Sequence, residues 1–139
     1  MKIFTEHVAV TTKGDSTLVD LTEQVAAVLA GSGMTEGQAL VFAPGATAGI
    51  TTIEYEPGLL HDFPQALERI APADHPYHHD NTWGDGNGHG HVRASMIGPS
   101  LTVPFESGRL LLGTWQQIVL VDCDTRPRKR DMVVQLIGT

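Results

Sequence analysis

Residues 100–138 read SLTVPFESGRLLLGTWQQIVLVDCDTRPRKRDMVVQLIG, and this stretch decides the fold class. Four segments in it have the short, apolar and β-branched composition of strands: 100–105, 109–113, 114–122 and 131–138. The tetrapeptide ESGR between the first two is typical of a tight hairpin turn. A series of short strands separated by turn signals predicts a mainly antiparallel sheet.

The first half of the chain adds strands and two helices. IFTEHVAV at 3–10, ALVFA at 39–43 and TAGITTIEYE at 47–56 have strand composition. VDLTEQVAAVLAGSG at 19–33 carries helix-start residues, an apolar face and a terminal glycine, and LLHDFPQALERIA at 59–71 predicts a second, short or kinked helix. We therefore expect an α+β fold in which a mainly antiparallel, barrel-like sheet is combined with two helices. A length of 139 residues fits a single domain, 1–139.

Composition excludes several classes of protein. A formal charge of −7 argues against a general nucleic-acid binder, which needs an electropositive face. RPRKR at 126–130 stands between two strand-like segments and is interpreted as a solvated hairpin turn, with a phosphate-binding patch as the alternative. No stretch approaches the ~20 apolar residues of a membrane span, and the N-terminus lacks a signal-peptide pattern, so we expect a cytoplasmic protein. The single cysteine, Cys123, lies in an apolar run and predicts an unreactive, half-buried thiol.

A glycine-rich segment with two histidines, GDGNGHGHVRAS at 84–95, carries the strongest chemical signal. If residues 89–96 form a strand, His89, His91, Arg93 and Ser95 share one face, because side chains alternate along a strand. Two imidazoles on one strand face can reach a single zinc-like ion. The sequence therefore predicts a divalent metal, with zinc as the first choice.

A third metal ligand must come from elsewhere in the chain. PYHHD at 76–80 offers His78 and His79; the alternatives are His61, His75 and a carboxylate of Asp80, Asp85 or Glu54. Arg93 and Ser95 beside the glycines would suit a phosphate or carboxylate, and the segment lacks the GxxxxGK[ST] pattern of a P-loop. The partner predicted by these residues is a small anionic molecule.

The chain resembles the YjbQ-like family, often labelled secondary thiamine-phosphate synthase. The resemblance is carried by GNGHGHVRASMIGPSLTVPF, by GRLLLGTWQQIVLVDCDTRPRKR and by VVQLIG, and GTWQQI is its most specific block. It implies a barrel-like α+β domain that assembles as a homotrimer. The activity it implies joins a pyrimidine diphosphate to a thiazole phosphate and releases pyrophosphate.

The family's motifs can be placed residue by residue. Its YxH element falls on Tyr77 and His79, and its NxHxH element falls on Asn87, His89 and His91. The resemblance thus implies His79, His89 and His91 as the metal-binding trio. Many members carry a histidine and a threonine where this chain has Gly45 and Ala46, which puts the family's activity in question here.

Two functions remain open from the sequence, beside a structural interpretation in which the histidines only satisfy hydrogen bonds at a subunit interface. The first is a metal-dependent enzyme, either a transferase of the thiamine-phosphate synthase type or a hydrolase. In it Glu54 acts as general acid or base, Arg93 assists catalysis, and Asn87, Arg93 and Ser95 bind the substrate. The second is a homo-oligomer that binds a metal or small anion without turnover. Gln116 shares a predicted strand face with Ile118 and Leu120 and is expected to be buried.

Overall fold

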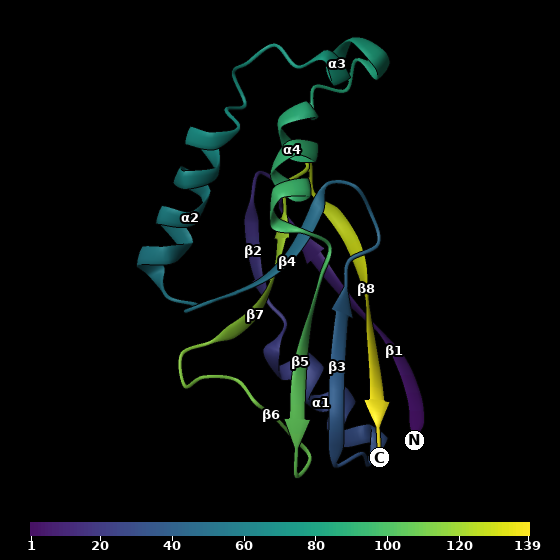
Figure 1. The fold of residues 1–139 in the computed structure, drawn as a ribbon. Helices are drawn as coiled ribbons and strands as arrows, with labels where there is room; N and C mark the ends of the chain where they lie inside the picture. Colours follow the sequence, from purple (N-terminus) through teal and green to yellow (C-terminus); the bar gives the residue numbers. More distant parts are fainter.

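The computed structural model describes all of residues 1–139, which form eight strands and four helices (Figure 1). The strands are β1 (Lys2–Thr12), β2 (Thr17–Asp20), β3 (Glu36–Phe42), β4 (Ala48–Ile53), β5 (Ser100–Glu106), β6 (Arg109–Leu110), β7 (Gln117–Asp122) and β8 (Arg128–Gly138). The helices are α1 (Thr22–Ser32), α2 (Pro57–Ile70), α3 (His78–Trp83) and α4 (Gly88–Ile97). The α+β class is confirmed. The two predicted helices are α1 and α2, whereas α3 and α4 were not predicted. None of the helices is long and apolar enough to cross a membrane.

Two antiparallel sheets form the β-structure. The larger sheet has the strand order β1-β8-β3-β5-β6, and the smaller has the order β2-β7-β4. Every ladder in both sheets is antiparallel, as the sequence predicts. The larger sheet curls into a half-barrel, and both chain ends lie at the end of it that is remote from α3 and α4 (Figure 1).

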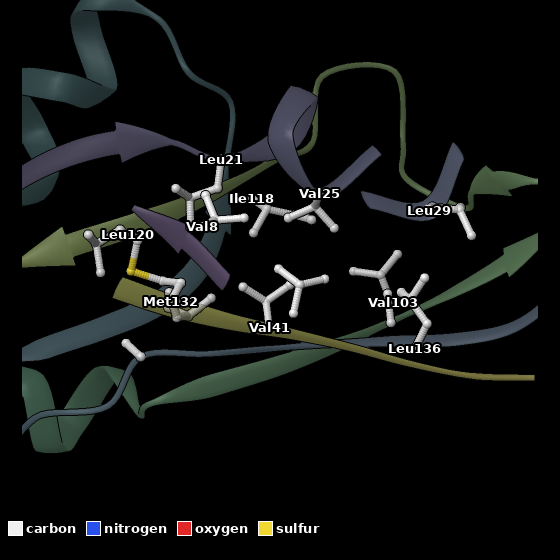
Figure 2. Packing of buried hydrophobic residues seen from close by; sticks show 14 of the residues in the cluster. Val8, Leu21, Val25, Leu29, Val41, Val103, Ile118, Leu120, Met132 and Leu136 are labelled. Carbon is white, nitrogen blue, oxygen red and sulfur yellow. The ribbon is translucent and has the colours of Figure 1, made fainter. Parts of the chain in front are cut away.

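Strand β7 is buried on both faces, which makes it the centre of the packing. Ile118 and Leu120 belong to the main core, which fills the space between the two sheets and α1 (Figure 2). Val119 and Val121 point the other way into a second cluster, which also contains Leu67 of α2. This alternation follows from the two-residue period of a strand. The continuous apolar run IVLV is therefore covered by the larger sheet on one side and by α2 and α4 on the other.

Local sequence signals account for several element ends. Ser107 and Gly108 have φ angles of 52° and 72°, and they form the two-residue turn that the ESGR motif predicts between β5 and β6. Gly33 ends α1 in the left-handed conformation, with φ of 68°. Pro57 begins α2, where Glu56 accepts hydrogen bonds from the Gly58 and Leu59 amides.

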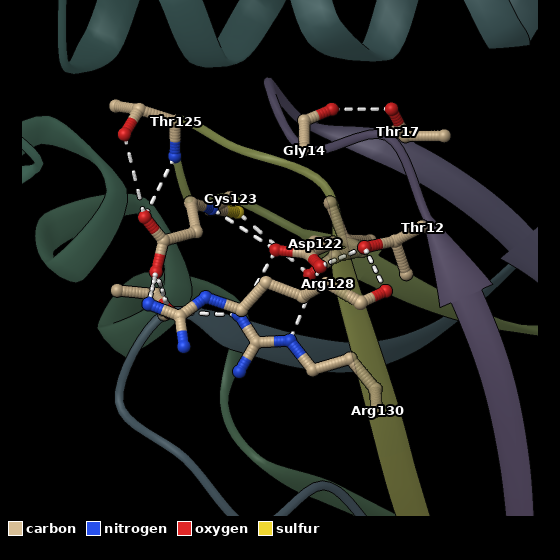
Figure 3. Close-up of polar contacts among 11 residues, drawn as sticks. Thr12, Gly14, Thr17, Asp122, Cys123, Thr125, Arg128 and Arg130 are labelled. Atoms are coloured by element: carbon tan, nitrogen blue, oxygen red, sulfur yellow. Dashed lines mark hydrogen bonds and ion pairs between the residues drawn. The ribbon is translucent and has the colours of Figure 1, made fainter.

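A buried polar network joins the two sheets at the end of β7 (Figure 3). Asp122 is fully buried, and both of its carboxylate oxygens accept hydrogen bonds from Arg130 of β8, at 3.1 and 3.0 Å. Thr12 of β1 donates its hydroxyl to the same carboxylate. Arg130 also donates to the Thr47 hydroxyl at 2.8 Å, next to the start of β4. The network therefore ties the end of β7 to β1, to β8 and to the residue that precedes β4.

The network corrects the interpretation of RPRKR as a solvated hairpin turn. β7 and β8 belong to different sheets, so residues 123–127 connect the sheets and do not close a hairpin. Arg130 is only 9% exposed, and Arg128 pairs with the buried Asp124 at 2.7 Å. Two of the basic side chains neutralise buried carboxylates, which a composition argument cannot detect.

The pH dependence of stability should report on this network. Burial alone would raise the pKa of Asp122, but hydrogen bonds from Arg130, Thr12 and the Asp124 amide outweigh it and hold that pKa below its ordinary value. The stabilisation is therefore present above the unfolded-state pKa of about 3.9 and is lost as the pH falls through the lower folded-state pKa. Urea unfolding between pH 2.5 and pH 7 should show this loss. Asp122→Asn should flatten it and cost about 3–5 kcal/mol at pH 7, since it leaves Arg130 buried without its partner.

Asp131→Asn on the exposed side of β8 is the matched control and should leave the profile unchanged. An Asp122→Asn protein with wild-type stability at pH 7 would contradict the role assigned to the network.

Candidate functional site

The predicted site residues lie on helices and not on a strand. His79 is in α3, and His89, His91, Arg93 and Ser95 are all in α4. The expectation of a strand over 89–96 is therefore wrong. Asp80 ties the two helices together, because its carboxylate accepts a hydrogen bond from the Gly88 amide at 2.9 Å.

Tertiary packing explains why this segment is helical. Gly88 at its first position, together with Gly90 and Val92, gives it poor helix propensity, so local sequence does not predict a helix. The backbone of α4, however, lies directly against the end of β7: a Cβ on Gly90 would come within 2.3 Å of the Cys123 carbonyl oxygen. On the neighbouring strand, a Cβ on Gly49 would come within 2.6 Å of the Ile97 side chain. The glycines allow a close helix–sheet contact that propensity does not reveal.

The helix separates the two imidazoles that a strand would have placed side by side. Successive helical residues are about 100° apart, so side chains at i and i+2 differ by about 200°. His89 is 5% exposed and faces Tyr77, at 6.3 Å between ring centroids. His91 is partly exposed and packs beside His79 at 4.2 Å between ring centroids. The structure thus brings His79 and His91 together and leaves His89 on the other side of α4.

No three His, Cys, Asp or Glu side chains of this chain are arranged to hold a metal ion. The carboxylate nearest to the histidine pair is Asp85, whose Oδ1 lies 3.7 Å from Nε2 of His79. The trio His79, His89 and His91 stays a prediction, but the shared strand face from which its geometry was argued does not exist.

Unpartnered polar atoms gather in this region. Four buried side-chain nitrogen or oxygen atoms in the chain have no hydrogen-bond partner, and three of them are Nε2 of His79, Oδ1 of Asn87 and Nδ1 of His89. Buried polar atoms are normally paired, because leaving one without a partner costs about 1–3 kcal/mol. Burial, and secondarily the charge of Arg93, lower the pKa of His89, which favours its neutral form. A neutral imidazole with a free nitrogen can accept a proton or bind a cation.

Arg93 is engaged within the protein. It is 5% exposed, and its guanidinium donates to the Ala71 carbonyl at 2.9 Å, to the Ser16 hydroxyl at 3.1 Å and to the Glu68 carboxylate. The hydrogen bond from Arg93 is the largest influence on Glu68 and holds the pKa of that carboxyl below its ordinary value. These contacts connect α4 to α2 and to the turn before β2, which is a positioning arrangement.

The remaining predicted residues lie in different places. Asn87 is buried at the start of α4, and the Ser95 hydroxyl donates to the His91 carbonyl one turn earlier, at 2.7 Å. Glu54 follows β4 and lines a cavity of about 320 Å³ that includes Trp115 and no histidine. The six residues of β4, at about 3.3 Å each, place roughly 20 Å between Glu54 and the loop that precedes the strand.

Gln116 and Cys123 differ in burial. Gln116 is exposed rather than buried, because β7 begins one residue later; its side chain donates to the Thr52 hydroxyl at 3.1 Å. Cys123 is 1% exposed, so its thiol is fully rather than half buried, and burial raises the pKa of this thiol to about 11, which agrees with an unreactive cysteine.

Sequence reasoning missed Arg130 as a residue of this region. A cavity of about 210 Å³ is lined by His91 and Ser95 of α4 and by Gly45 and Ala46 of the loop before β4. Arg130 lies against the same loop, because a Cβ on Gly45 would come within 3.0 Å of its Nη1 atom. The sequence shows an arginine next to a predicted strand, but nothing in its position indicates a contact with the loop at 44–46.

Comparison with known proteins gives a consistent result over nearly the whole chain. Residues 6–139 match the model of the family described as UPF0047 protein YjbQ-like. The chain belongs to the UPF0047/YjbQ-like family. A UPF0047 protein of Methanothermobacter thermautotrophicus is 36% identical over 138 residues, which cover 99% of this chain and 94% of that protein. A UPF0047 protein of Archaeoglobus fulgidus is 36% identical over 120 residues, covering 86% and 90%.

Solved structures of UPF0047/YjbQ-like proteins share the fold. A protein of Sulfolobus solfataricus, described as of unknown function, superposes with a TM-score of 0.93 at 31% identity and covers 99% of both chains. A family member from Clostridium acetobutylicum gives a TM-score of 0.87 at 34% identity, covering 95% of this chain and 99% of that one. The family predicted from the sequence is confirmed.

Substituting Gly90 tests the contact that positions the histidine helix. Gly90→Ala should lower the free energy of unfolding by about 1–3 kcal/mol, because the added methyl group would overlap the Cys123 carbonyl. Gly31→Ala is the matched control, since a Cβ there meets nothing within 4 Å and alanine favours the helix by about 1 kcal/mol. Urea unfolding of both variants measures the difference. A Gly90→Ala protein at least as stable as Gly31→Ala would refute the close packing.

Proposed function

We propose that this protein is a metal-dependent enzyme that acts on a phosphorylated or otherwise anionic small molecule, with its metal at the junction of α3 and α4. The observation that carries the proposal is the contact of the His79 and His91 rings, beside which Nε2 of His79 is buried without a hydrogen-bond partner. A bound ion would supply the partner that this nitrogen lacks.

The histidine pair fits a divalent ion in part. His79 and His91 lie with their rings 4.2 Å apart, and Nε2 of His79 is free to donate its lone pair. Zinc accepts neutral imidazole nitrogen, and a catalytic zinc keeps at least one position for water or substrate. His79 and His91 would hold the ion. The proposed third ligand, His89, would have to leave its packing against Tyr77 to join them.

Such an ion, when bound, supplies a Lewis acid and lowers the pKa of a bound water toward about 7. The chain's own residues would hold and orient an anionic substrate beside it. Arg93 acts through α4: its contacts with Ala71 and Glu68 fix the helix that carries His91. These groups would serve a transferase of the thiamine-phosphate synthase type and a hydrolase equally well, so the reaction type is left open.

One observation favours the second candidate, a homo-oligomer that binds a metal or small anion without turnover. Glu54, the proposed acid or base, is separated from the loop next to His91 by the full length of β4. Within one chain, the metal would therefore lack a carboxylate proton donor on that strand. Both candidates are compatible with the homotrimer that the family resemblance implies.

Metal analysis tests the proposal directly. Protein purified without a histidine tag should contain close to one zinc-like ion per chain by elemental analysis. His79→Ala and His91→Ala should each lose it, because they remove ligands of the same ion. His61→Ala on the exposed side of α2 is the control and should keep it. Metal-free wild-type protein, or full occupancy in His79→Ala, would refute the metal site.

A further variant and an activity screen separate the two candidates. His89→Ala should lose the metal if His89 is the third ligand. Turnover of phosphorylated small molecules that is abolished by a chelator would support the enzyme. A bound metal without any turnover in this screen would favour the binding protein.

A further inference from the structure

We infer that the loop 44–46, Arg130 and His91 form a subsite for the phosphate or carboxylate group of a small molecule. The inference rests on the proposed function in one respect: it identifies where the anionic group of the proposed substrate binds. It replaces Arg93 by Arg130 as the arginine that contacts this group.

The subsite is a small cavity between the loop and α4. Its volume is about 210 Å³, and Gly45 and Ala46 line it from the loop while His91 and Ser95 line it from the helix. Pockets for drug-sized ligands have volumes of about 300–1,000 Å³, so this one suits a small group. None of its lining residues is acidic, which is notable in a chain with a formal charge of −7.

Arg130 supplies an unused hydrogen-bond donor beside the loop. Its Nε and Nη2 atoms are bound to Asp122 and Thr47, but Nη1 donates to no group of the protein. Nη1 lies 3.0 Å from the position that a Cβ on Gly45 would take, so the glycine leaves it uncovered. Arg130 is only 9% exposed and is held by its other bonds, and a fixed guanidinium is well suited to an oxyanion.

Backbone amides of the loop add donors. The amides of Gly45 and Ala46 donate to no backbone or side-chain acceptor, and both residues are exposed. Successive free N–H groups in a turn form a concavity that attracts anions. The neighbouring carboxylates do not oppose this, because Asp122 is paired with Arg130 and Asp124 is paired with Arg128. The subsite thus combines the lining imidazole of His91 and two free loop amides with Nη1 of Arg130, which lies against Gly45 but does not itself line the cavity.

The test measures binding of inorganic phosphate to the full-length, chelator-treated protein by titration calorimetry. We expect saturable binding of one phosphate per chain. Ala46→Asp should weaken it at least tenfold, about 1.4 kcal/mol, because it places a negative charge at the cavity. Ala46→Asn has nearly the same shape without the charge and should stay within about threefold of wild type. Absent or non-saturable phosphate binding, or equal affinities of these two variants, would overturn the inference.

A second variant examines the guanidinium itself. Arg130→Lys keeps a positive charge opposite Asp122 but removes Nη1, and it should weaken phosphate binding at least tenfold. Circular dichroism establishes whether this variant is folded. If it is not, the comparison of Ala46→Asp with Ala46→Asn decides whether the subsite exists. If folded Arg130→Lys protein binds phosphate like wild type, the assignment of Arg130 is wrong.

The outcomes are separable from those of the proposed function, because these measurements use metal-free protein. Phosphate binding in a chain that never holds a metal would support the subsite and refute the metal centre. A chain that contains metal as purified, but binds no phosphate after chelator treatment, would support the metal centre and refute the subsite.

Discussion

The ion pair between Asp122 and Arg130 is the contact on which the arrangement of the two sheets depends. Asp122 is the last residue of β7, which is buried on both faces, and Arg130 belongs to β8 in the other sheet. Removing one charge of a buried pair leaves the other uncompensated, at a cost of about 3–5 kcal/mol. Because Thr12 and Thr47 complete the hydrogen bonds of the same pair, β1 and the start of β4 are fixed by it as well.

The same end of β7 also positions the candidate site. Cys123 follows Asp122 directly, its amide donates to the Thr47 carbonyl at 2.8 Å, and its own carbonyl abuts Gly90 of α4. Asp122 and Cys123 therefore position both the loop that lines the small cavity and the helix that carries His91. A disturbance of the Asp122–Arg130 pair should be felt at the site even though neither residue was predicted to belong to it.

Much of the fold could be predicted from local signals, whereas the site could not. The IVLV run of β7 and the ESGR turn were interpreted correctly because a strand period and a two-residue turn are local properties. Helix α4 was not, because Gly90 serves a contact with a residue 33 positions later. RPRKR was misinterpreted for a similar reason: whether a connection closes a hairpin or crosses between sheets is decided by pairing partners outside it.

The helical form of the histidine segment changes the roles that its two imidazoles can take. On a strand they would be equivalent ligands, but on α4 they differ in burial, in neighbours and in access to solvent. His89 is buried against Tyr77, and its lowered pKa favours the neutral form. In this conformation it therefore faces the interior of the protein and not the solvent. His91 lies at a cavity and beside His79, where it can meet a ligand that arrives from solvent. The proposed centre is therefore organised around His79 and His91, a pair formed across α3 and α4, and the unpartnered Nδ1 of His89 lies on the other side of α4.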